Sequence, residues 1–234
     1  MAASMPDSIF VWLRSQRFLL RLTVLTRILL AAGFIPTGMV KLLGQRFTTL
    51  PRSNAIGAFF EAMYQTGAFW NFMGAAQVLA GVLLLIPAFA HLGALVFLPV
   101  MACIVAIVTG VDFGAGTILI TVLMLLAVLY LMAWDYGRFR SLFTTRPFPA
   151  GPRVPDLKLD AWERAGFVTF AVALFAFFGF TRNLVGAEVG RWAIWLGLAA
   201  GIFTLLRFVV ISVRQGRGRD DSRTTGARRG EKPA

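Results

Sequence analysis

Cysteine, histidine and lysine are scarce in this chain of 234 residues, which contains one cysteine, one histidine and three lysines. The single cysteine, Cys103, excludes an internal disulfide, a thiol–disulfide pair and a zinc-finger ligand set. The single histidine, His91, excludes a haem held by two histidines of the chain and a His-rich metal centre. The sequence also has no P-loop, dinucleotide-binding glycine fingerprint or nucleophile elbow. We therefore expect any redox cofactor to be organic and non-covalent, or to be carried by a partner.

Charge is scarce as well. Charged residues make up 15% of the chain, hydrophobic residues make up 58%, and the mean hydropathy is +0.74. Ordinary soluble domains have about 25% charged and about 45–50% apolar residues. A soluble fold could not cover its surface with so few charged groups, and a disordered chain would be far less apolar. The composition therefore predicts a polytopic membrane protein.

Six apolar stretches approach the roughly 20 residues that a spanning helix needs. They cover approximately residues 22–43, 68–90, 92–111, 115–134, 165–181 and 192–213. We therefore expect an all-α transmembrane helix bundle with a four-helix core and two further C-terminal helices. In the last stretch, Gly197 and Gly201 have the spacing that lets two helices approach closely. The two glycines are expected to pack either within the bundle or against a second copy of the chain.

Polar segments divide the chain into five predicted parts. Segment 9–21 places large apolar residues on one helical face and arginines on the other, which is typical of a helix that lies in the membrane interface. The parts are an interfacial segment at 1–21, a four-helix domain at 22–137, a basic linker at 138–164, two helices at 165–213 and a disordered basic tail at 214–234.

The positions of lysine and arginine predict the orientation. Sixteen of them lie in residues 14–21, 138–164 and 214–232, on one side of the expected membrane, and four lie on the other side. Because the side richer in these cations faces the cytoplasm, both termini are expected there. The net charge of +12 then reflects contact with anionic lipid head groups, and no nucleic-acid partner is expected.

The segment 44–67 is expected on the outer side. Ser53 or Asn54 can cap a helix in this segment, because apolar residues recur with helical spacing after them. These residues are Ile56, Phe59, Phe60 and Met63. The predicted helix would rest on the outer leaflet or form a roof over the bundle.

Residues 20–140 carry motifs that resemble the DoxX family of bacterial membrane proteins. The motifs are Arg27 to Leu42 with Gly38-Met-Val-Lys41-Leu42 at its end, Tyr64 to Trp70, Gly74-Ala-Ala-Gln77 to Gly81, and Trp134-Asp135-Tyr136. The resemblance implies a four-helix bundle in the bacterial cytoplasmic (inner) membrane and an association with quinone-linked or thiol-redox assemblies. Many relatives have glutamate at the position of Gln77, so the resemblance does not imply an acid-dependent proton step here.

Two cations lie within the first expected span. Arg27 and Lys41 differ by about 40° around the helix and are about 21 Å apart along it, so they mark two ends of one stripe. Each can extend to its nearer interface. Alternatively, Lys41 contacts an anion or a quinone head group on the outer side, with Glu61 as its counter-charge.

The second span has its own stripe, formed by Trp70, Gly74, Gln77 and Gly81. Gln77 is expected to form a hydrogen bond either with a neighbouring helix or with a quinone carbonyl, with Trp70 stacked on the quinone ring. Tyr64 would line the mouth of the same pocket. The sequence therefore predicts a pocket for a quinone or a lipid head group, formed by Arg27, Lys41, Glu61, Tyr64, Trp70, Gln77 and Asp112. Asp112, in the outer turn, is expected to be a turn residue or a partner of Lys41 or Arg46.

These observations leave three classes of function open. The first is an accessory or quinone-interacting subunit of a membrane redox system, which would need a membrane or soluble redox partner. The second is a structural or assembly protein of the membrane. The third is a small-solute transporter, disfavoured because no internal repeat is visible. The sequence disfavours an enzyme that acts alone, since no thiol pair or metal set is present.

Overall fold

The computed structural model describes residues 11–139, 158–204, 206 and 207, and every regular element in this part of the chain is a helix. Residues 11–15 and 187–204 are also helical. The labelled helices are α2 (Arg17–Leu42), α3 (Ala55–Gln65), α4 (Ala68–Leu85), α5 (Ala90–Gly110), α6 (Ala115–Trp134), α7 (Tyr136–Phe139) and α8 (Ala161–Thr181). The expected all-α fold is confirmed.

Five helices in the described ranges are long and apolar enough to cross a membrane, namely α2, α4, α5, α6 and α8. Their bounds follow the expected spans closely, and α6 coincides with the expected stretch 115–134. The sixth expected span, 192–213, is described only up to residue 207. Its described part belongs to a helix that begins at residue 187. The remainder of that span lies outside the described residues, as do the tail 214–234 and most of the linker 138–164.

The N-terminal end differs from the expectation. The backbone of Gln16 is extended, with ψ 115°, and it separates the helical residues 11–15 from α2. Residues 17–21 therefore form the first turns of α2 instead of continuing one interfacial helix over 9–21. These turns pack against other helices, because Tyr130 of α6 donates to the backbone oxygen of Leu19 at 3.0 Å and Arg21 pairs with Glu163 of α8.

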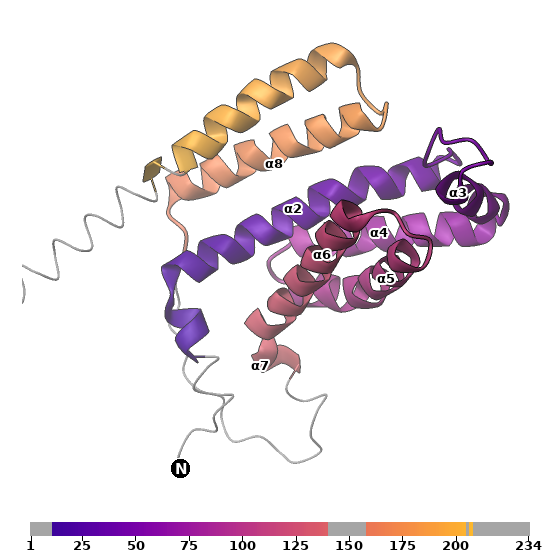
Figure 1. Ribbon diagram of the computed structural model, residues 1–234. Helices are drawn as coiled ribbons and strands as arrows, with labels where there is room; N and C mark the ends of the chain where they lie inside the picture. The colour runs from indigo at the N-terminus through magenta and orange to yellow at the C-terminus, as the bar shows by residue number, and fades with distance from the viewer. Residues whose placement is uncertain (1–10, 140–157, 205, 208–234) are drawn as a thin grey trace, which may run out of the picture.

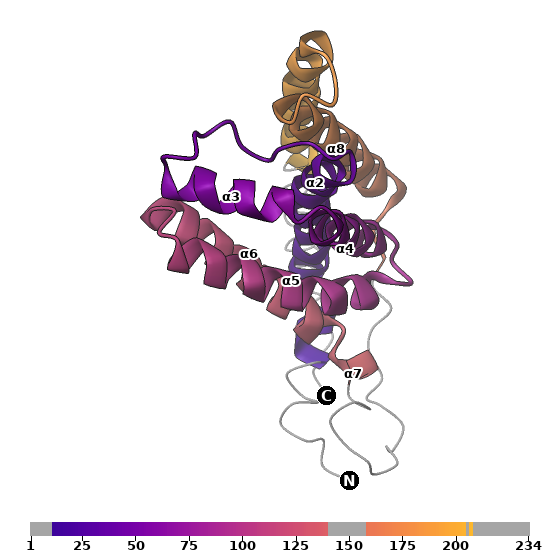
Figure 2. The same cartoon turned by 90° about the vertical axis from the view of Figure 1, so that its right-hand side faces the viewer.

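Helix α2 lies at the centre of the molecule. One side of α2 is covered by the hairpin of α8 and residues 187–204, and the other side by α4, α5 and α6 (Figures 1 and 2). The core lies on the second side, where the rings of Phe34 and Phe97 meet edge to face at 4.7 Å. Around them pack Leu30, Ala80, Leu84, Ala94, Met101, Val128 and Leu131.

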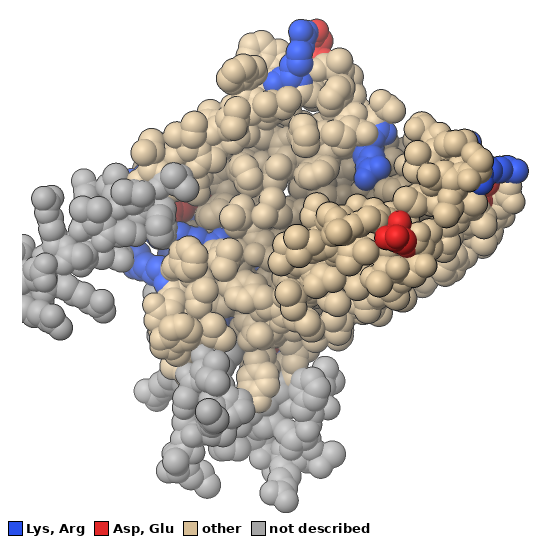
Figure 3. Space-filling model, viewed as in Figure 1, with Lys and Arg blue, Asp and Glu red and all other residues tan. Residues whose placement is uncertain are grey.

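The outward face of the bundle is apolar. Large side chains on α6 are more than half exposed, which water would oppose but lipid favours. Examples are Leu119, Ile120, Leu123 and Leu126. Figure 3 shows a broad face without charged atoms, with lysine, arginine and acidic atoms toward its ends. Cys103, whose position within an apolar span would suit a small packing residue, is instead exposed on this kind of surface. By length and composition of its helices, the molecule is a multi-pass helical membrane protein.

Two glycines set the crossing of α2 and α4. A Cβ at Gly38 would lie 2.7 Å from the backbone oxygen of Gly74, and a Cβ at Gly74 would lie 2.7 Å from the backbone oxygen of Gly38. Side chains at these positions would therefore force the helices apart. Because the backbones meet here, Lys41 and Gln77, three residues further along each helix, come within reach of one another.

Gly197 and Gly201 face α8 within the same chain. A Cβ at Gly197 would lie 3.4 Å from that of Ala173, and a Cβ at Gly201 would lie 4.0 Å from the ring of Phe170. This geometry is the packing within the bundle that the glycine spacing allowed. A homo-oligomer through these glycines stays a prediction.

Candidate functional site

A chamber of about 530 Å³ lies beneath α3, at the end of the bundle where α2 and α8 finish and α4 begins. We call this end the α3 end. Side chains from α2, α3, α4, α5, α6 and α8 form the walls, and most of them are apolar or aromatic. The polar wall residues are Thr37, Lys41, Gln77, Thr117, Thr121 and Arg182. The helix predicted to form a roof over the bundle is confirmed as α3, capped by the side chain of Asn54.

Lys41 points into this chamber and is only 4% exposed. Its Nζ donates to Gln77 Oε1 at 3.0 Å and to the backbone oxygen of Thr37 at 3.3 Å. It also lies 4.7 Å from the ring centroid of Phe47 and 5.2 Å from that of Trp70. Side chains on a helix lean toward its N-terminus, so Lys41 reaches back along α2 toward Thr37. The alternative in which Lys41 extends outward to the interface is therefore wrong.

Gln77 is the partner of Lys41 across the crossing of α2 and α4. It is 3% exposed, and its Oε1 accepts the hydrogen bond from Lys41. The expected hydrogen bond to a neighbouring helix is thus confirmed. The same amide keeps Nε2 as a donor, and the described part of the chain offers this nitrogen no hydrogen-bond acceptor.

Two aromatic side chains, Trp70 and Tyr64, connect the start of α4 and the end of α3 to the loop after α2, beside Lys41. Trp70 is 1% exposed, lines the chamber, and donates from Nε1 to the backbone oxygen of Gln45 at 3.2 Å. Tyr64 donates to the backbone oxygen of Gly44 at 3.2 Å, and its ring meets Trp70 edge to face at 6.1 Å. Tyr64 therefore packs against Trp70 outside the chamber. The expectation that Tyr64 lines the pocket is wrong.

Glu61 is not the counter-charge of Lys41. Its Oε2 lies 2.6 Å from Arg46, and its Oε1 lies 2.5 Å from Arg52 and 3.1 Å from the amide of Gln65. The hydrogen bond from Arg52 is the main reason why the pKa of Glu61 lies below its usual range, and Gln65 and Arg46 add to it. The carboxylate thus ties the loop after α2 to α3, outside the chamber.

Asp112 also lies outside the chamber. It is exposed with a positive φ of 54°, and its Oδ1 accepts from the backbone nitrogen of Gly114 at 3.3 Å. Aspartate tolerates this left-handed conformation in turns. The turn interpretation is confirmed, and pairing with Lys41 or Arg46 is not observed in the described residues.

Arg27 lies at the opposite end of the bundle from Lys41. Its Nη2 is 3.0 Å from Asp135 Oδ2, where the Trp134-Asp135-Tyr136 segment ends α6. A hydrogen bond of 2.8 Å between Thr23 and Tyr130 lies beside this pair. The ion pair joins α2 to α6, and Arg27 takes no part in the chamber to which the sequence had assigned it.

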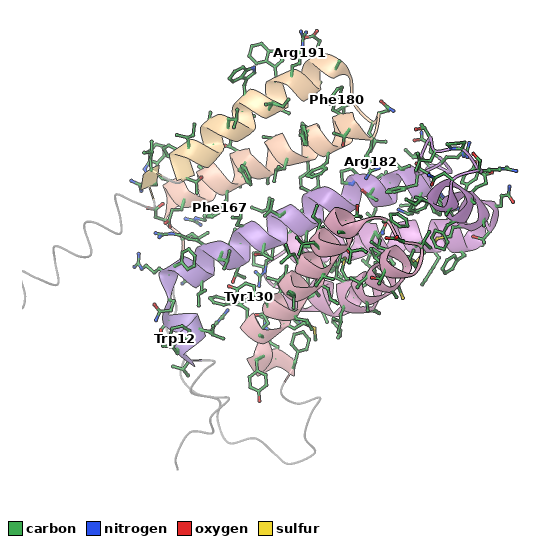
Figure 4. The ribbon with its side chains drawn as sticks, in the orientation of Figure 1. Trp12, Tyr130, Phe167, Phe180, Arg182 and Arg191 are labelled. Carbon is green, nitrogen blue, oxygen red and sulfur yellow. The ribbon has the colours of Figure 1, made fainter. Side chains whose placement is uncertain are left out.

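Arg182 is the site residue that the sequence did not single out. It follows α8 at the end of that helix that lies toward α2 (Figure 4). It lines the chamber, and its guanidinium carbon lies 4.5 Å from the ring centroid of Phe47. Burial lowers the pKa of this guanidinium from its ordinary value. Within the described ranges, no carboxylate lies within 4.0 Å of Lys41 or Arg182. Arg182 is one of the four cations that the sequence analysis placed on the side opposite the basic ends, but no residue spacing predicts which face of α2 the last hairpin covers.

An apolar groove of about 710 Å³ lies beside the chamber, between α3, α4 and α5. The two cavities share four wall residues, Phe59, Met63, Met73 and Ile107. The groove has further apolar residues of α4 and α5 along it, including Phe69, Phe72, Val96 and Pro99. Unbranched methionine side chains are adaptable, so the shared wall is one that can yield to a ligand.

Comparison with known proteins gives a relative without an assigned activity. The uncharacterized protein YwoB of Bacillus subtilis (strain 168) is 33% identical to the chain over 127 residues, which are 52% of this chain and 81% of the relative. No family model matches the chain. No solved structure matches it either.

Proposed function

Because the chain belongs to the family of the uncharacterized protein YwoB, whose name gives no activity, we propose a function from the chemistry of its own site. The chamber at the α3 end binds the head group of a lipid-soluble quinone. The chain is then an accessory, quinone-interacting subunit of a membrane redox system. The DoxX-like motifs of residues 20–140 support the same assignment.

The buried ammonium group of Lys41 carries this proposal. A cation at membrane depth is costly unless other groups stabilise it, and such groups usually mark a functional site. In the chamber, Lys41 has two neutral oxygens and two aromatic faces, but no carboxylate within 4.0 Å among the described residues. A ligand oxygen would complete its coordination.

A quinone matches the other features of the chamber. One carbonyl oxygen can accept from Lys41, and the free Nε2 of Gln77 is a second donor nearby. A flat ring can lie against the buried face of Trp70 or the ring of Phe47. The volume of about 530 Å³ falls in the usual range of about 300–1,000 Å³ for small-molecule sites.

The apolar groove beside the chamber accommodates the rest of such a ligand. A quinone carries an apolar tail, and the groove between α4 and α5 has a wall that is free of charged residues in the described part. Because the surrounding lipid is as apolar as the groove, the tail would gain close packing contacts there and not a hydrophobic free energy. The head group would enter past the shared methionines Met63 and Met73.

In this proposal, a partner protein donates electrons to the bound quinone or accepts electrons from it. One cysteine and one histidine cannot supply a dithiol or a bis-histidine metal site within the chain. The quinone would therefore exchange electrons with a membrane or soluble redox partner. We place the protein in a bacterial-type cytoplasmic membrane with both termini inside, so that the α3 end faces outward and the basic ends meet anionic lipid.

A structural or assembly role is the second candidate. The direct contact of Lys41 with Gln77 and the close crossing at Gly38 and Gly74 favour it, since both would stabilise a bundle that has no ligand. In that case, the polar pair would only fix the register of α2 and α4. The two candidates differ in whether the chamber holds a molecule.

Extraction of the purified protein tests this difference. The full chain would be purified in mild detergent, its lipids extracted, and quinones measured by mass spectrometry against the amount of protein. We expect a quinone near one per chain in the wild type. About tenfold less is expected in Lys41→Met and Gln77→Ala, since each loses a hydrogen bond to the ligand that is worth about 1.5 kcal/mol or more.

The matched control is Lys158→Met, which removes a lysine at the other end of the molecule. This variant should retain the wild-type amount of quinone. Equal and low quinone in all samples, with correctly folded protein, would contradict the proposal and favour the structural role. Uptake of a solute by proteoliposomes would instead favour transport.

A further inference from the structure

The C-terminal hairpin, which consists of α8 and residues 187–204, contributes to the wall of the chamber. Helix α8 packs along α2, and a buried ion pair between Arg21 and Glu163, with Nη2 and Oε1 2.5 Å apart, joins the two helices at the end opposite α3. Asp160, the N-cap of α8, pairs with Arg207 of the last helix at 2.6 Å. These contacts fix the axis of α8, so its far end reaches the chamber wall with Phe178 and Arg182.

Arg182 and Lys41 share one aromatic side chain. The guanidinium carbon of Arg182 lies 4.5 Å and the Nζ of Lys41 lies 4.7 Å from the ring centroid of Phe47. An aromatic face attracts a cation but does not neutralise it. Two positive groups are therefore held close together at the wall of a mostly apolar chamber.

The neighbouring charges do not compensate these two cations. Glu61 is engaged by Arg46 and Arg52, and those two arginines add positive potential at the same end. The carboxylate of Asp112 accepts a hydrogen bond from the backbone nitrogen of Gly114 in its own turn. An apolar cavity with uncompensated positive charge favours a negatively charged ligand, since the low dielectric strengthens the attraction.

We propose that Arg182 makes the chamber selective for an acidic head group, namely a flat quinone-like ring with an ionised oxygen and one apolar tail. This inference rests on the proposed quinone site and specifies its ligand. Arg182 is the specificity-determining residue, supplied by the C-terminal hairpin outside the four-helix unit. Lys41 and Gln77 bind the head group, and Arg182 selects its charge.

A matched pair of ligands tests the charge preference. An alkyl hydroxynaphthoquinone is ionised at neutral pH, and its methyl ether has the same ring and tail without the charge. Binding of each to the full chain in detergent would be measured from the quenching of tryptophan fluorescence, since Trp70 lines the chamber. We expect the wild type to bind the ionised compound about tenfold more tightly than the ether.

The variants separate selectivity from folding. Arg182→Gln should reduce the preference to about twofold, while Arg182→Lys keeps most of it. Arg191→Gln is the control, because Arg191 is exposed on the last helix and pairs with Glu188 there. It should leave the preference unchanged. The ratio of two affinities is insensitive to a general loss of folded protein, which would affect both ligands.

The outcomes distinguish this inference from the proposed function. Tight binding of both ring compounds without preference, or an unchanged preference in Arg182→Gln, would overturn the role of Arg182 and leave the quinone site standing. Absence of binding of either ring compound would overturn both. A fatty-acid anion without a ring serves as a competitor. If it competes as strongly as the hydroxynaphthoquinone, and if this competition depends on Arg182, the charge selectivity is supported and the quinone assignment is contradicted.

Discussion

Lys41 and Gln77 determine the polarity of the chamber. Their contact is a hydrogen bond from the lysine to a neutral amide, so no carboxylate at position 77 competes with a ligand for Lys41. A carboxylate in the position of Gln77 would lie close to this ammonium and act as an internal counter-charge. The residue at position 77 thus decides whether the positive charge is used inside the protein or by a bound molecule.

Gln77→Glu tests this interpretation. We expect the variant to retain about tenfold less quinone, because its carboxylate competes with the ligand for Lys41. The free energy of unfolding should rise by about 1 kcal/mol, equivalent to about 2–4 °C in Tm for a chain of this size. Thermal unfolding in detergent and quinone extraction would measure both effects. Gln45→Glu, which adds the same charge on the exposed loop, should change neither quantity.

Glu61 gives a prediction for the dependence of stability on pH. Since hydrogen bonds from Arg52 and Gln65 lower its pKa in the folded protein, Glu61 stabilises the fold above its unfolded pKa of about 4.3. This stabilisation is lost as the pH falls through the lower, folded pKa. In thermal unfolding, the wild type should be more stable than Glu61→Gln at pH 7, and the difference should shrink below about pH 4. A difference that stays constant over this range would contradict the assigned contacts.

Single residues show where prediction from the sequence succeeds. Trp70 and Gln77 were placed together by helical spacing, which depends only on the period of an α-helix. Lys41 was placed at the end of its span that precedes the predicted helix in 44–67, and it lies at the α3 end of α2, but the direction of its side chain was left open. The positions of Glu61 and Arg182 depend on how separate segments fold against each other. Helical spacing carries no such information.

The crossing of α2 and α4 is the element that assembles the site. The backbones touch at Gly38 and Gly74, which allows Lys41 to reach Gln77 across the contact. Both glycines belong to motifs that were recognised in the sequence. Their pairing with each other was not predicted, because a glycine motif gives no partner helix.

Gly38→Ala would test the role of this contact. The added Cβ would lie 2.7 Å from a backbone oxygen and 3.1 Å from the Cβ of Gln77, so the helices must separate. We expect a loss of about 1–3 kcal/mol in the free energy of unfolding, and a lower affinity for quinone. Both would be measured on the purified protein.

Gly33→Ala is the matched control on the same helix. A Cβ at Gly33 meets nothing within 4 Å, and alanine favours a helix over glycine by about 1 kcal/mol. This variant should therefore be as stable as the wild type or slightly more stable. Equal behaviour of the two variants would show that the close crossing does not limit the packing of α2 against α4.

The helix ends mark the limits of a prediction from apolar runs. Apolar stretches located α4, α5, α6 and α8 within a few residues, because lipid requires long uncharged helices. The start of α2 was missed since Arg17 and Arg21 looked like part of an interfacial helix. Their inclusion in α2 depends on Glu163 and Tyr130, which lie far away in the sequence.

The whole molecule combines two differently built ends around an apolar middle. Ion pairs between helices, such as Arg27 with Asp135 and Arg21 with Glu163, close the end opposite α3. The α3 end keeps an open chamber in which Lys41 and Arg182 have no carboxylate partner in the described ranges. The proposed ligand site thus lies at one end of the molecule, and the ion pairs between helices lie at the other.

Photo-cross-linking tests the central claim most directly. A quinone with a photoreactive tail would be added to the full chain in lipid nanodiscs, and labelled peptides mapped by mass spectrometry. We predict labels at Met63 and Met73, where chamber and groove share a wall, with loss of labelling in Lys41→Met but not in Lys158→Met. Labelling spread over the lipid-facing side chains of α6 and unaffected by Lys41→Met would contradict the account.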